Sequence, residues 1–358
     1  MSVRSVGKVV ILLVLVIGVF SQNHSQDMDK YLFEKFQRFI TKYNKDYGSL
    51  EEFTKRFEIF KQNYDLTHNS TSTSDIPEED EENTKIGTTQ FSDLTTEEFE
   101  KQFLTLNAND LPSENDENSE NFLDSKDDVI ENNNSTDKNL TRLLQTVPSS
   151  FDWRTKGAVT SVKTQGSCGA CWAFCSVSNI EGLYYKKYKK LISFSEQQLV
   201  DCDSSNNGCG GGMMAPAYNY IRRAGGLETR TSYPYKGYKS TCKHRTSLSV
   251  AKVTGYKFAG SRNEDVIKTF LYNTAPLAVT MNASKLQYYK GGVLTGSCST
   301  NPNHGVTIVG YGTSSTGVPY WVVKNSWGPN WGEGGYFKIR RGTGMCGINN
   351  YVISAILG

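Results

Sequence analysis

One cysteine stands where its side chain could act as a nucleophile. Cys171 closes a glycine-containing loop, and the apolar stretch from Trp172 to Tyr185 predicts a buried helix directly after it. A thiol attacks only as its thiolate, and the exposed N–H groups of a helix N-terminus stabilise an anion. Gln165 lies six residues upstream and carries an amide that can turn back toward the same place. Because acyl transfer needs such a donor for the developing oxyanion, the segment predicts an acyl-transfer enzyme.

The segment from Gln165 to Phe174 resembles the active-site segment of papain-like cysteine proteases, which read Cys-Gly-Ser/Ala-Cys-Trp/Tyr there. Those proteases also carry a histidine and an asparagine about 130–150 residues downstream. Here His304 follows Cys171 by 133 positions, within Asn-His-Gly-Val, and Asn325 follows it by 154, within Lys-Asn-Ser-Trp-Gly. Three separate motifs in the order of the family make the resemblance specific.

The resemblance implies a mechanism in which two lobes bring these residues together across a cleft. His304 would take the thiol proton of Cys171, and the resulting thiolate–imidazolium pair would be ready at mildly acidic pH. Asn325 would bind the far ring nitrogen of His304, and Trp327 would shield that bond from water. Gln165 and the backbone N–H of Cys171 would form the oxyanion hole. We expect no cofactor and no metal site.

Positions carried over from the family predict where a substrate binds. The pocket for the side chain two residues before the scissile bond (P2) would be walled by Met213, Met214, Thr280, Gly305 and Tyr351, with Gly211, Gly212 and Trp327 elsewhere in the cleft. This lining is apolar and adaptable, which predicts a hydrophobic P2 residue. Since Tyr351 stands where many relatives have a smaller residue, we expect aliphatic groups to be preferred over large aromatic ones. No insertion resembles the occluding loop of cathepsin B, so endopeptidase action on proteins and peptides is expected.

Two other functions stay open at this level. A related aminopeptidase, similar to cathepsin H, would differ by requiring a free substrate amine. A catalytically idle homologue, acting as a binding or inhibitory protein, would normally lack the nucleophile, whereas Cys171, His304, Asn325 and Gln165 are all present. We further expect cystatin-type inhibitors as partners, and a monomer that binds no nucleic acid.

All eight cysteines lie between Cys168 and Cys346. Cys175 is one helical turn beyond Cys171 and has no obvious partner, so we interpret it as a buried core thiol in preference to a second nucleophile. The sequence alone leaves the pairing of the other six open. The resemblance selects Cys168–Cys209, Cys202–Cys242 and Cys298–Cys346. A redox pair or half a zinc site at Cys168 and Cys171 is disfavoured, because the required βαβ neighbourhood and further ligands are missing.

The first 21 residues predict a secretory signal peptide. Arg4 and Lys8 precede an apolar run from Val9 to Phe20, which is short for a bilayer span; an uncleaved anchor is the alternative. We expect no other membrane span. The secretory route permits disulfides, and it implies a lysosome, an acidic vacuole or the exterior as destination. Candidate glycan acceptors are Asn23, Asn69, Asn133, Asn134, Asn139 and Asn282.

Residues 22–106 predict two aromatic-striped helices. Phe33, Phe36, Phe39 and Ile40 recur at helical spacing within 31–43, and a capping box at 49–52 opens a second helix with a stripe of its own. A further capping box at 95–98 predicts a short third helix, and the polar stretch 70–83 predicts a mobile loop.

This region also resembles the inhibitory prosegment of cathepsin L-like proteases. Their E-x3-R-x3-F-x2-N pattern is met by Glu52, Arg56, Phe60 and Asn63, although Thr67 and Thr71 replace its final isoleucine and asparagine. A companion motif is met at Gly87, Phe91 and Asp93, with Thr89 in place of asparagine. The resemblance implies an intramolecular inhibitor whose removal activates the enzyme.

Charge divides the chain into two parts of opposite sign. Residues 22–146 carry 13 Lys+Arg and 28 Asp+Glu, a net charge of −15, whereas residues 147–358 carry 24 and 9, a net charge of +15. Opposite signs suggest that one part covers the other, although a solvated acidic region would give the same balance. If prosegment carboxylates pair with basic residues of the second part, acid should loosen the prosegment.

The second part predicts a two-lobe α+β fold, papain-like, with a helical lobe and a β-barrel-like lobe. Residues 107–146, with ten acidic residues and nine asparagines, predict a disordered linker, and 147–358 matches the mature peptidase from end to end. Ser195 should cap a short helix and Ser261 a helix over 265–272. Strands are expected at 251–253, 277–280, 305–311, 320–324 and 336–340.

Overall fold

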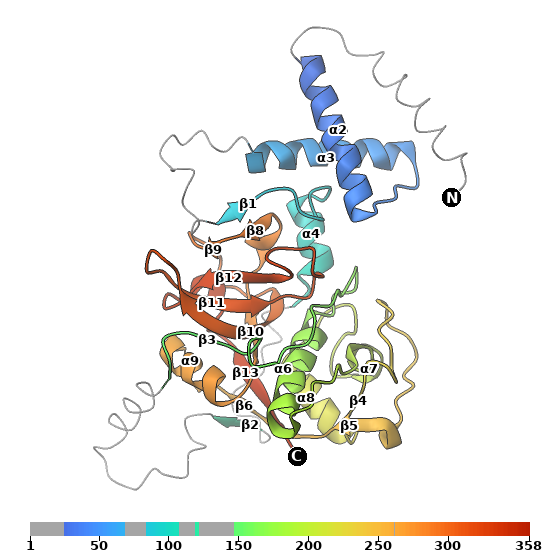
Figure 1. Ribbon diagram of the computed structural model, residues 1–358. Helices are drawn as coiled ribbons and strands as arrows, with labels where there is room; N and C mark the ends of the chain where they lie inside the picture. The colour runs from blue at the N-terminus through green and yellow to red at the C-terminus, as the bar shows by residue number, and fades with distance from the viewer. Residues whose placement is uncertain (1–24, 69–83, 107–118, 122–146, 261) are drawn as a thin grey trace.

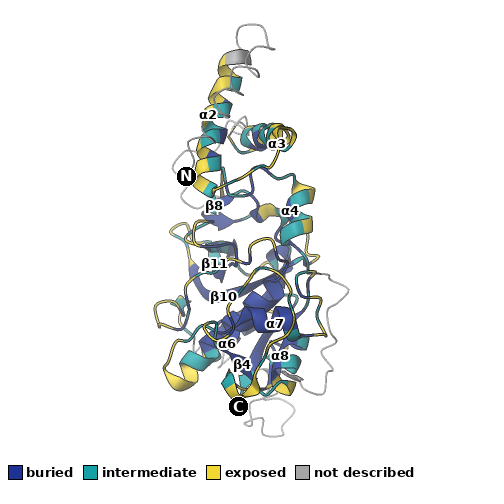
Figure 2. Ribbon diagram, turned by 90° about the vertical axis from the view of Figure 1, so that its right-hand side faces the viewer, coloured by how far each residue is buried: buried dark blue, intermediate teal, exposed yellow. Residues whose placement is uncertain are grey.

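A computed structural model of the chain describes residues 25–68, 84–106, 119–121, 147–260 and 262–358. Figure 1 shows three parts in sequence along the molecule: a pair of crossed helices, a sheet-rich lobe and a helical lobe. Buried positions concentrate in the two lobes, whereas the crossed helices expose much of their surface (Figure 2). The predicted α+β class, with a helical segment in front, is confirmed.

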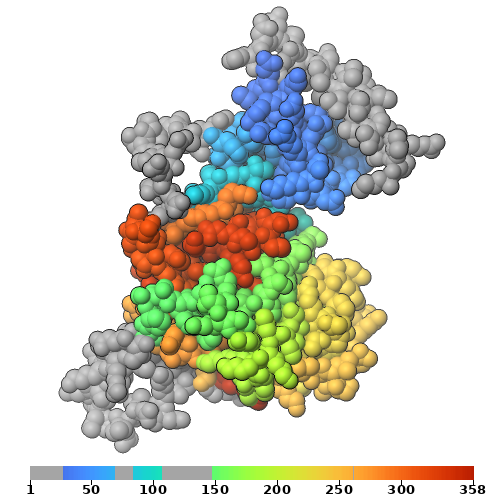
Figure 3. Space-filling model, viewed as in Figure 1, coloured from blue at the N-terminus to red at the C-terminus, as the bar shows by residue number. Residues whose placement is uncertain are grey.

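The crossed helices are α2 (Ser25–Tyr43) and α3 (Leu50–His68), both in the predicted places. Their aromatic stripes face each other: the Phe36 ring lies 5.2 Å from Phe60 and 5.3 Å from Phe57, measured between centroids. The Ser49 hydroxyl accepts a hydrogen bond from the Glu52 backbone N–H and so caps α3. The pair therefore has a small aromatic core of its own. In Figure 3 the two helices, in blue, lie above the orange and red residues of the sheet-rich lobe.

From this pair the chain runs along the sheet-rich lobe toward the helical one. Strand β1 (Lys85–Ile86) pairs with β8 (Tyr289–Gly291). Helix α4 (Thr96–Phe103) follows, and its capping box is complete: Thr95 accepts from the Glu98 N–H while the Glu98 carboxylate accepts from the Thr95 N–H. The pairing of β1 with β8 joins the prosegment to the mature part through backbone hydrogen bonds.

The helical lobe contains α6 (Cys171–Tyr188), α7 (Glu196–Cys202), α8 (Met214–Arg223) and the hairpin of β4 (Leu227–Glu228) with β5 (Ser249–Ala251). Helix α6 is buried along its first 12 residues, as expected for a central helix. Ser195 caps α7 as predicted. Short 3-10 turns lie at Thr246–Leu248, Ser284–Leu286 and Met345–Gly347.

The sheet-rich lobe is built on one sheet whose strand order is β2-β6-β13-β7-β10-β11-β12-β9, with β3 also paired to β10. The bounds are β2 (Ser119–Asn121), β3 (Phe151–Asp152), β6 (Val253–Phe258), β7 (Leu277–Met281), β9 (Val293–Leu294), β10 (His304–Thr313), β11 (Pro319–Lys324), β12 (Tyr336–Arg340) and β13 (Val352–Leu357). Helix α9 (Glu264–Asn273) packs against this sheet. Four of the five predicted strands are present, whereas the predicted strand 251–253 is interrupted at Lys252, since β5 ends at Ala251 and β6 begins at Val253.

Two further predictions need correction. The linker 107–146 is not irregular throughout, because Ser119–Asn121 pairs in parallel with the edge strand β6; an open edge needs only backbone groups, so an acidic segment can join it. Helix α9 is capped by Asn263, which accepts from the Asp265 N–H, and not by Ser261. The predicted signal peptide, the loop 70–83, the rest of the linker and every glycan candidate except Asn282 lie outside the described residues.

Candidate active site

Cys171 is the first residue of α6 and is fully buried. The loop before it is anchored by the Cys168–Cys209 disulfide and by a hydrogen bond from the Gly169 N–H to the Cys209 carbonyl, 3.0 Å long. The helix therefore begins at the thiol, with no acidic residue in its first turn. The local structure places the thiol at the positive end of the helix dipole.

His304 begins β10, and this strand packs directly against the first turn of α6. A Cβ on Gly305 would lie 3.4 Å from the carbonyl of Cys171 and 3.0 Å from the sulfur of Cys175. Only glycine lets the strand approach this closely. The register of β10 with β7 pairs His304 with Met281, which fixes the histidine at the end of the sheet beside α6.

The imidazole of His304 has a defined orientation. Its Nε2 lies 2.9 Å from Oδ1 of Asn325, which also accepts the Ser326 N–H over 2.8 Å. An acceptor on that side requires the ring proton on Nε2, so Nδ1 is the nitrogen left to take a proton. The ring of Trp327 lies 4.9 Å from that of His304. Asn325 and Trp327 thus lie where the sequence predicted.

Gln165 is held beside this group by Ser326. The Ser326 hydroxyl donates to Oε1 of Gln165 over 2.6 Å, and the Gln165 N–H donates to the Ser326 carbonyl over 2.8 Å. The side-chain Nε2 of Gln165 donates to the carbonyl of Cys168, leaving a second amide hydrogen. Ser326 was not singled out from the sequence, although it stands next to Asn325 in the motif.

An extended prosegment stretch, residues 104–106, crosses the site between the two lobes. The Thr105 hydroxyl donates to the Gly169 carbonyl over 3.0 Å, and the Leu106 N–H donates to the Asn303 carbonyl over 3.1 Å. The Thr105 carbonyl sits so close to Gly211 that a Cβ there would be 2.1 Å from it. Neither Thr105 nor Leu106 belongs to a sequence motif, so no role was predicted for them.

Burial under the prosegment disfavours the ionised forms of Cys171 and His304. Burial raises the pKa of the Cys171 thiol to about 11, against contacts with the Gly305 N–H and the Thr105 side chain that act in the other direction. Burial also lowers the pKa of His304 to about 4, although the bond to Asn325 opposes the shift. Both shifts disfavour the expected thiolate–imidazolium pair in the covered form, because burial destabilises both ionised states.

Comparisons with known proteins agree with this geometry. The model for the papain family of cysteine proteases matches residues 147–356, and that for the cathepsin propeptide inhibitor domain matches residues 36–99. The chain belongs to the papain family of cysteine proteases. It is 37% identical to cysteine proteinase 1 of Dictyostelium discoideum over 98% of this chain and all of the relative.

Solved proforms of the papain family share its architecture. A recombinant stem bromelain precursor is 35% identical, with a TM-score of 0.76, and covers 91% of this chain and 99% of its own. Digestive procathepsin L 3 of Tenebrio molitor is 31% identical, with the same TM-score and the same coverage. The chain is thus a papain-family cysteine peptidase, a hydrolase, with its own propeptide inhibitor.

The P2 pocket positions carried over from the papain family lie together and are covered. Met213, Met214 and Tyr351 belong to one buried cluster with Leu106 of the prosegment, while Thr280 donates its N–H to the Tyr351 carbonyl beside them. Gly305 lies on β10 next to α6, and Gly212 packs against Asn206. Leu106 of the prosegment is only 4% exposed and is buried in the same cluster as these positions.

Trp327 is covered by prosegment aromatic residues. The rings of Phe91 and Phe99 meet it edge-on at 5.1 and 5.4 Å, and Gln90 donates to its carbonyl over 3.0 Å. Thr89, which replaces the asparagine of the companion motif, bonds the Gln287 carbonyl. The motif thus docks the prosegment on the sheet-rich lobe of this papain-family fold.

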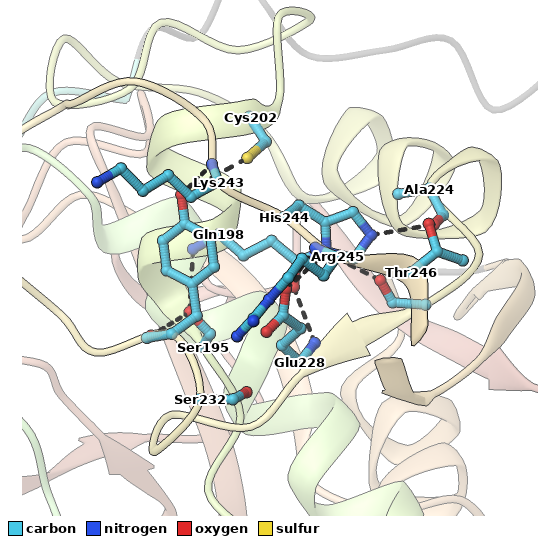
Figure 4. Close-up of polar contacts among 12 residues, drawn as sticks. Ser195, Gln198, Cys202, Ala224, Glu228, Ser232, Lys243, His244, Arg245 and Thr246 are labelled. Atoms are coloured by element: carbon cyan, nitrogen blue, oxygen red, sulfur yellow. Dashed lines mark hydrogen bonds and ion pairs between the residues drawn. The ribbon is translucent and has the colours of Figure 1, made fainter. Parts of the chain in front are cut away.

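The remaining cysteines form three disulfides and one further free thiol, and His244 lies away from the site. The structure contains the disulfides Cys168–Cys209, Cys202–Cys242 and Cys298–Cys346, the pairs that the resemblance implied, and leaves Cys171 and Cys175 as buried free thiols. His244 lies elsewhere, between the Glu228 carboxylate and the Ala224 carbonyl (Figure 4). Within the described ranges no three His, Cys, Asp or Glu side chains group as metal ligands. None of the helices described there is long and apolar enough to cross a bilayer.

The ion pairs expected between the prosegment and the mature part are not found among the described residues. Among the described residues, its carboxylates pair with its own cations: Glu98 with Lys55 and Arg56, and Asp93 with Lys45. No ion pair between described residues joins the prosegment to the mature domain, whose contacts are hydrogen bonds and apolar packing. Although burial opposes it, hydrogen bonds from Lys55 and Arg56 lower the pKa of Glu98 to about 2, so mild acid leaves this network intact.

Proposed function

We propose that the protein is a cysteine endopeptidase made as a zymogen. In this proposal Cys171 is the nucleophile, His304 the general base and acid, Asn325 its orienting partner and Gln165 an oxyanion donor. The main supporting observation is the extended prosegment stretch around Thr105. It lies over the buried Cys171, between Gly169 and Asn303. Residues 1–21 would be the signal peptide, 22–106 the prosegment, 107–146 the linker and 147–358 the mature enzyme.

The uncovered site supports a complete proton cycle. The thiol proton of Cys171 moves to Nδ1 of His304, and the sulfur attacks the peptide carbonyl carbon. The oxyanion accepts hydrogen bonds from the Cys171 N–H and the second amide hydrogen of Gln165. His304 gives its proton to the leaving amine, and a thioester remains. Water then attacks the thioester while His304 takes its proton, and the thiolate leaves.

We propose acid activation through His304, in place of ion pairs across the interface. Under the prosegment the pKa of His304 is about 4, whereas its ordinary value is 6.5. While Cys171 keeps its proton, uncovering the ring restores the ordinary pKa of His304, so protonation of His304 favours opening as pH falls from 6.5 toward 4. The net charges of −15 and +15 add a longer-range attraction that acid also weakens.

The P2 pocket should prefer aliphatic residues. Leu106 is buried in one cluster with Met213, Met214 and Tyr351, which supports a leucine-sized occupant. The Phe258 ring meets Tyr351 edge-on at 5.3 Å and limits movement of this floor. Dipeptidyl fluorogenic substrates with Leu or Val at P2 should therefore be cleaved faster than those with Phe. Faster cleavage with Phe would refute the assignment.

We also propose the cellular location, the oligomeric state and the inhibitors of the enzyme from the family to which it belongs. A propeptide-bearing papain-family enzyme with a predicted signal peptide and three disulfides fits the secretory route, ending in a lysosome, an acidic vacuole or outside the cell. We expect the mature enzyme to be a monomer inhibited by cystatin-type proteins. Size-exclusion chromatography of the mature enzyme with and without a cystatin measures both expectations.

An active-site probe tests the main proposal. An epoxysuccinyl reagent should label the protein only after acid treatment removes the prosegment, and the label should reside on Cys171. Cys171→Ser, cleaved by a trace of added active wild-type enzyme, should give a folded but unlabelled protein. Equal labelling before and after processing, or labelling that persists in Cys171→Ser, would contradict the assignment.

A further inference from the structure

Gln165 is held by hydrogen bonds from both lobes. From the sheet-rich lobe, the hydroxyl of Ser326 binds its side chain and the carbonyl of Ser326 accepts its N–H. From the helical lobe, the Tyr235 hydroxyl donates to the Gln165 carbonyl over 2.7 Å. Ser326 stands next to Asn325 in one sequence motif, whereas the proposed mechanism assigns no role to Tyr235. The phenol is therefore a contact to the candidate oxyanion donor that still needs a function.

The bond from Tyr235 fixes the peptide unit that joins Gln165 to Gly166. The carbonyl of this unit accepts from Tyr235, and its N–H donates to the Thr164 hydroxyl over 3.2 Å. Gly166 has a φ of +62°, and nothing lies within 4 Å of the place where a Cβ would stand. Because glycine adopts many backbone conformations at little steric cost, these two hydrogen bonds set the orientation of the unit. Its rotation would shift the backbone from which the Gln165 side chain projects.

The ring of Tyr235 is itself fixed relative to the helix that begins at Cys171. It meets the ring of Phe174 edge-on, with 4.9 Å between centroids, and Phe174 lies on α6 three residues after Cys171. The guanidinium of Arg230 lies 5.5 Å from the centroid of the Tyr235 ring. Arg230 is held in turn by the Glu196 carboxylate, which is only 1% exposed and lies 2.6 Å away. Tyr235 thus joins the Gln165 peptide to the helix that carries the thiol.

The hydroxyl of Tyr235 stays a donor at acidic and at neutral pH. Burial raises the pKa of Tyr235 well above its ordinary value, and the Glu196 carboxylate adds to the shift, while Arg230 opposes it. The phenol therefore keeps its single hydrogen, which it gives to the Gln165 carbonyl.

We propose that Tyr235 is a positioning residue for the oxyanion hole, which acts through the Gln165 carbonyl to keep the side-chain amide in place relative to Cys171. The inference rests on the proposed role of Gln165 as an oxyanion donor. Tyr235 takes no part in proton transfer. Because an oxyanion donor acts in the transition state, loss of the Tyr235 hydroxyl should lower kcat and leave KM nearly unchanged.

Alkylation of Cys171 separates this role from damage to the thiolate. Iodoacetamide transfers its carbon to the sulfur and releases iodide, so no oxyanion forms for Gln165 to stabilise. In the mature Tyr235→Phe enzyme, kcat should fall roughly tenfold. The rate of alkylation and its pH profile should match those of the wild type. An unchanged kcat, or an equal fall of kcat and of the alkylation rate, would overturn the proposal.

A double-mutant cycle shows whether Tyr235 acts through Gln165. Gln165→Ala alone should lower kcat roughly a hundredfold, and adding Tyr235→Phe should then cause no further loss, because the group that it positions is gone. A further tenfold loss in the double variant would overturn the inference and leave the oxyanion assignment intact. An unchanged kcat in Gln165→Ala would refute that assignment and the inference with it. Tyr188→Phe is the matched control, since its hydroxyl donates to the Gly358 oxygen at the far end of α6; it should behave like the wild type.

Discussion

Ser326 donates its hydroxyl proton to Oε1 of Gln165 over 2.6 Å, and this bond orients the amide whose nitrogen donates to the Cys168 carbonyl. Removing the hydroxyl leaves the Gln165 amide free to turn. Because the oxyanion bond strengthens in the transition state, Ser326→Ala should lower kcat roughly tenfold and leave KM nearly unchanged. Steady-state kinetics of the mature enzyme measures this. Ser314→Ala, in the β10–β11 turn, serves as a control; an unchanged kcat in Ser326→Ala would show that Gln165 needs no such support.

Leu106 should be the main apolar anchor of the prosegment over the cleft. Truncating a buried leucine costs about 2–5 kcal/mol, and here that loss weakens docking of the covering strand. Leu106→Ala zymogen should therefore react with an epoxysuccinyl probe at neutral pH roughly thirtyfold faster, or more, than the wild type. Leu50→Ala, at an exposed position at the start of α3, should react like wild type. Equal rates for both variants would remove Leu106 from the inhibitory contact.

Gly211 should be needed for both the prosegment and the substrate. Its φ is +111°, and an added Cβ would lie 2.1 Å from the Thr105 carbonyl. Gly211→Ala should therefore expose Cys171 in the zymogen and raise KM of the mature enzyme. Gly317→Ala is a matched control, since its φ is +89° but nothing lies within 4 Å of the added atom. If the two variants behaved alike, backbone strain and not the close approach would be responsible.

His304 should govern the acid step of activation. While Cys171 keeps its proton, protonation of His304 favours opening as pH falls from 6.5 toward 4. In a Cys171→Ser zymogen, the protection of the Leu106 amide against hydrogen exchange should fall between about pH 7 and pH 4.5. Adding His304→Asn should remove most of this fall, leaving only the smaller effect of the net charges. Protection that still falls in the double variant would assign the acid step to other groups.

The sequence singled out the residues of the candidate site because each stands in a local motif. Cys171 begins a helix, His304 begins a strand, and the spacing between motifs is shared with relatives that the comparisons identify. The helices of the prosegment were predictable for the same local reason, since aromatic spacing reports a buried face. The contacts between these motifs were implied by the family resemblance and could not be predicted from the motifs alone.

The contacts that create the covered state were not predictable in this way. Thr105 and Leu106 act through backbone groups and one aliphatic side chain, which carry no sequence signature. Net charge suggested ion pairs between prosegment and enzyme, whereas Glu98 and Asp93 pair within the prosegment. The net charge of a segment does not show which of its residues form ion pairs with each other. The parallel pairing of Ser119–Asn121 with β6 depends on an open sheet edge, which composition does not report.

The central claim is that the prosegment keeps the Cys171 thiol protonated and that its removal lets the thiolate form. Thiolate absorbance measured at about pH 6, as the difference between wild type and Cys171→Ser, tests this directly. The account predicts no thiolate signal from Cys171 in the intact zymogen and one thiolate per molecule after the prosegment is removed. A full thiolate signal in the zymogen, or none in the mature enzyme, would contradict it.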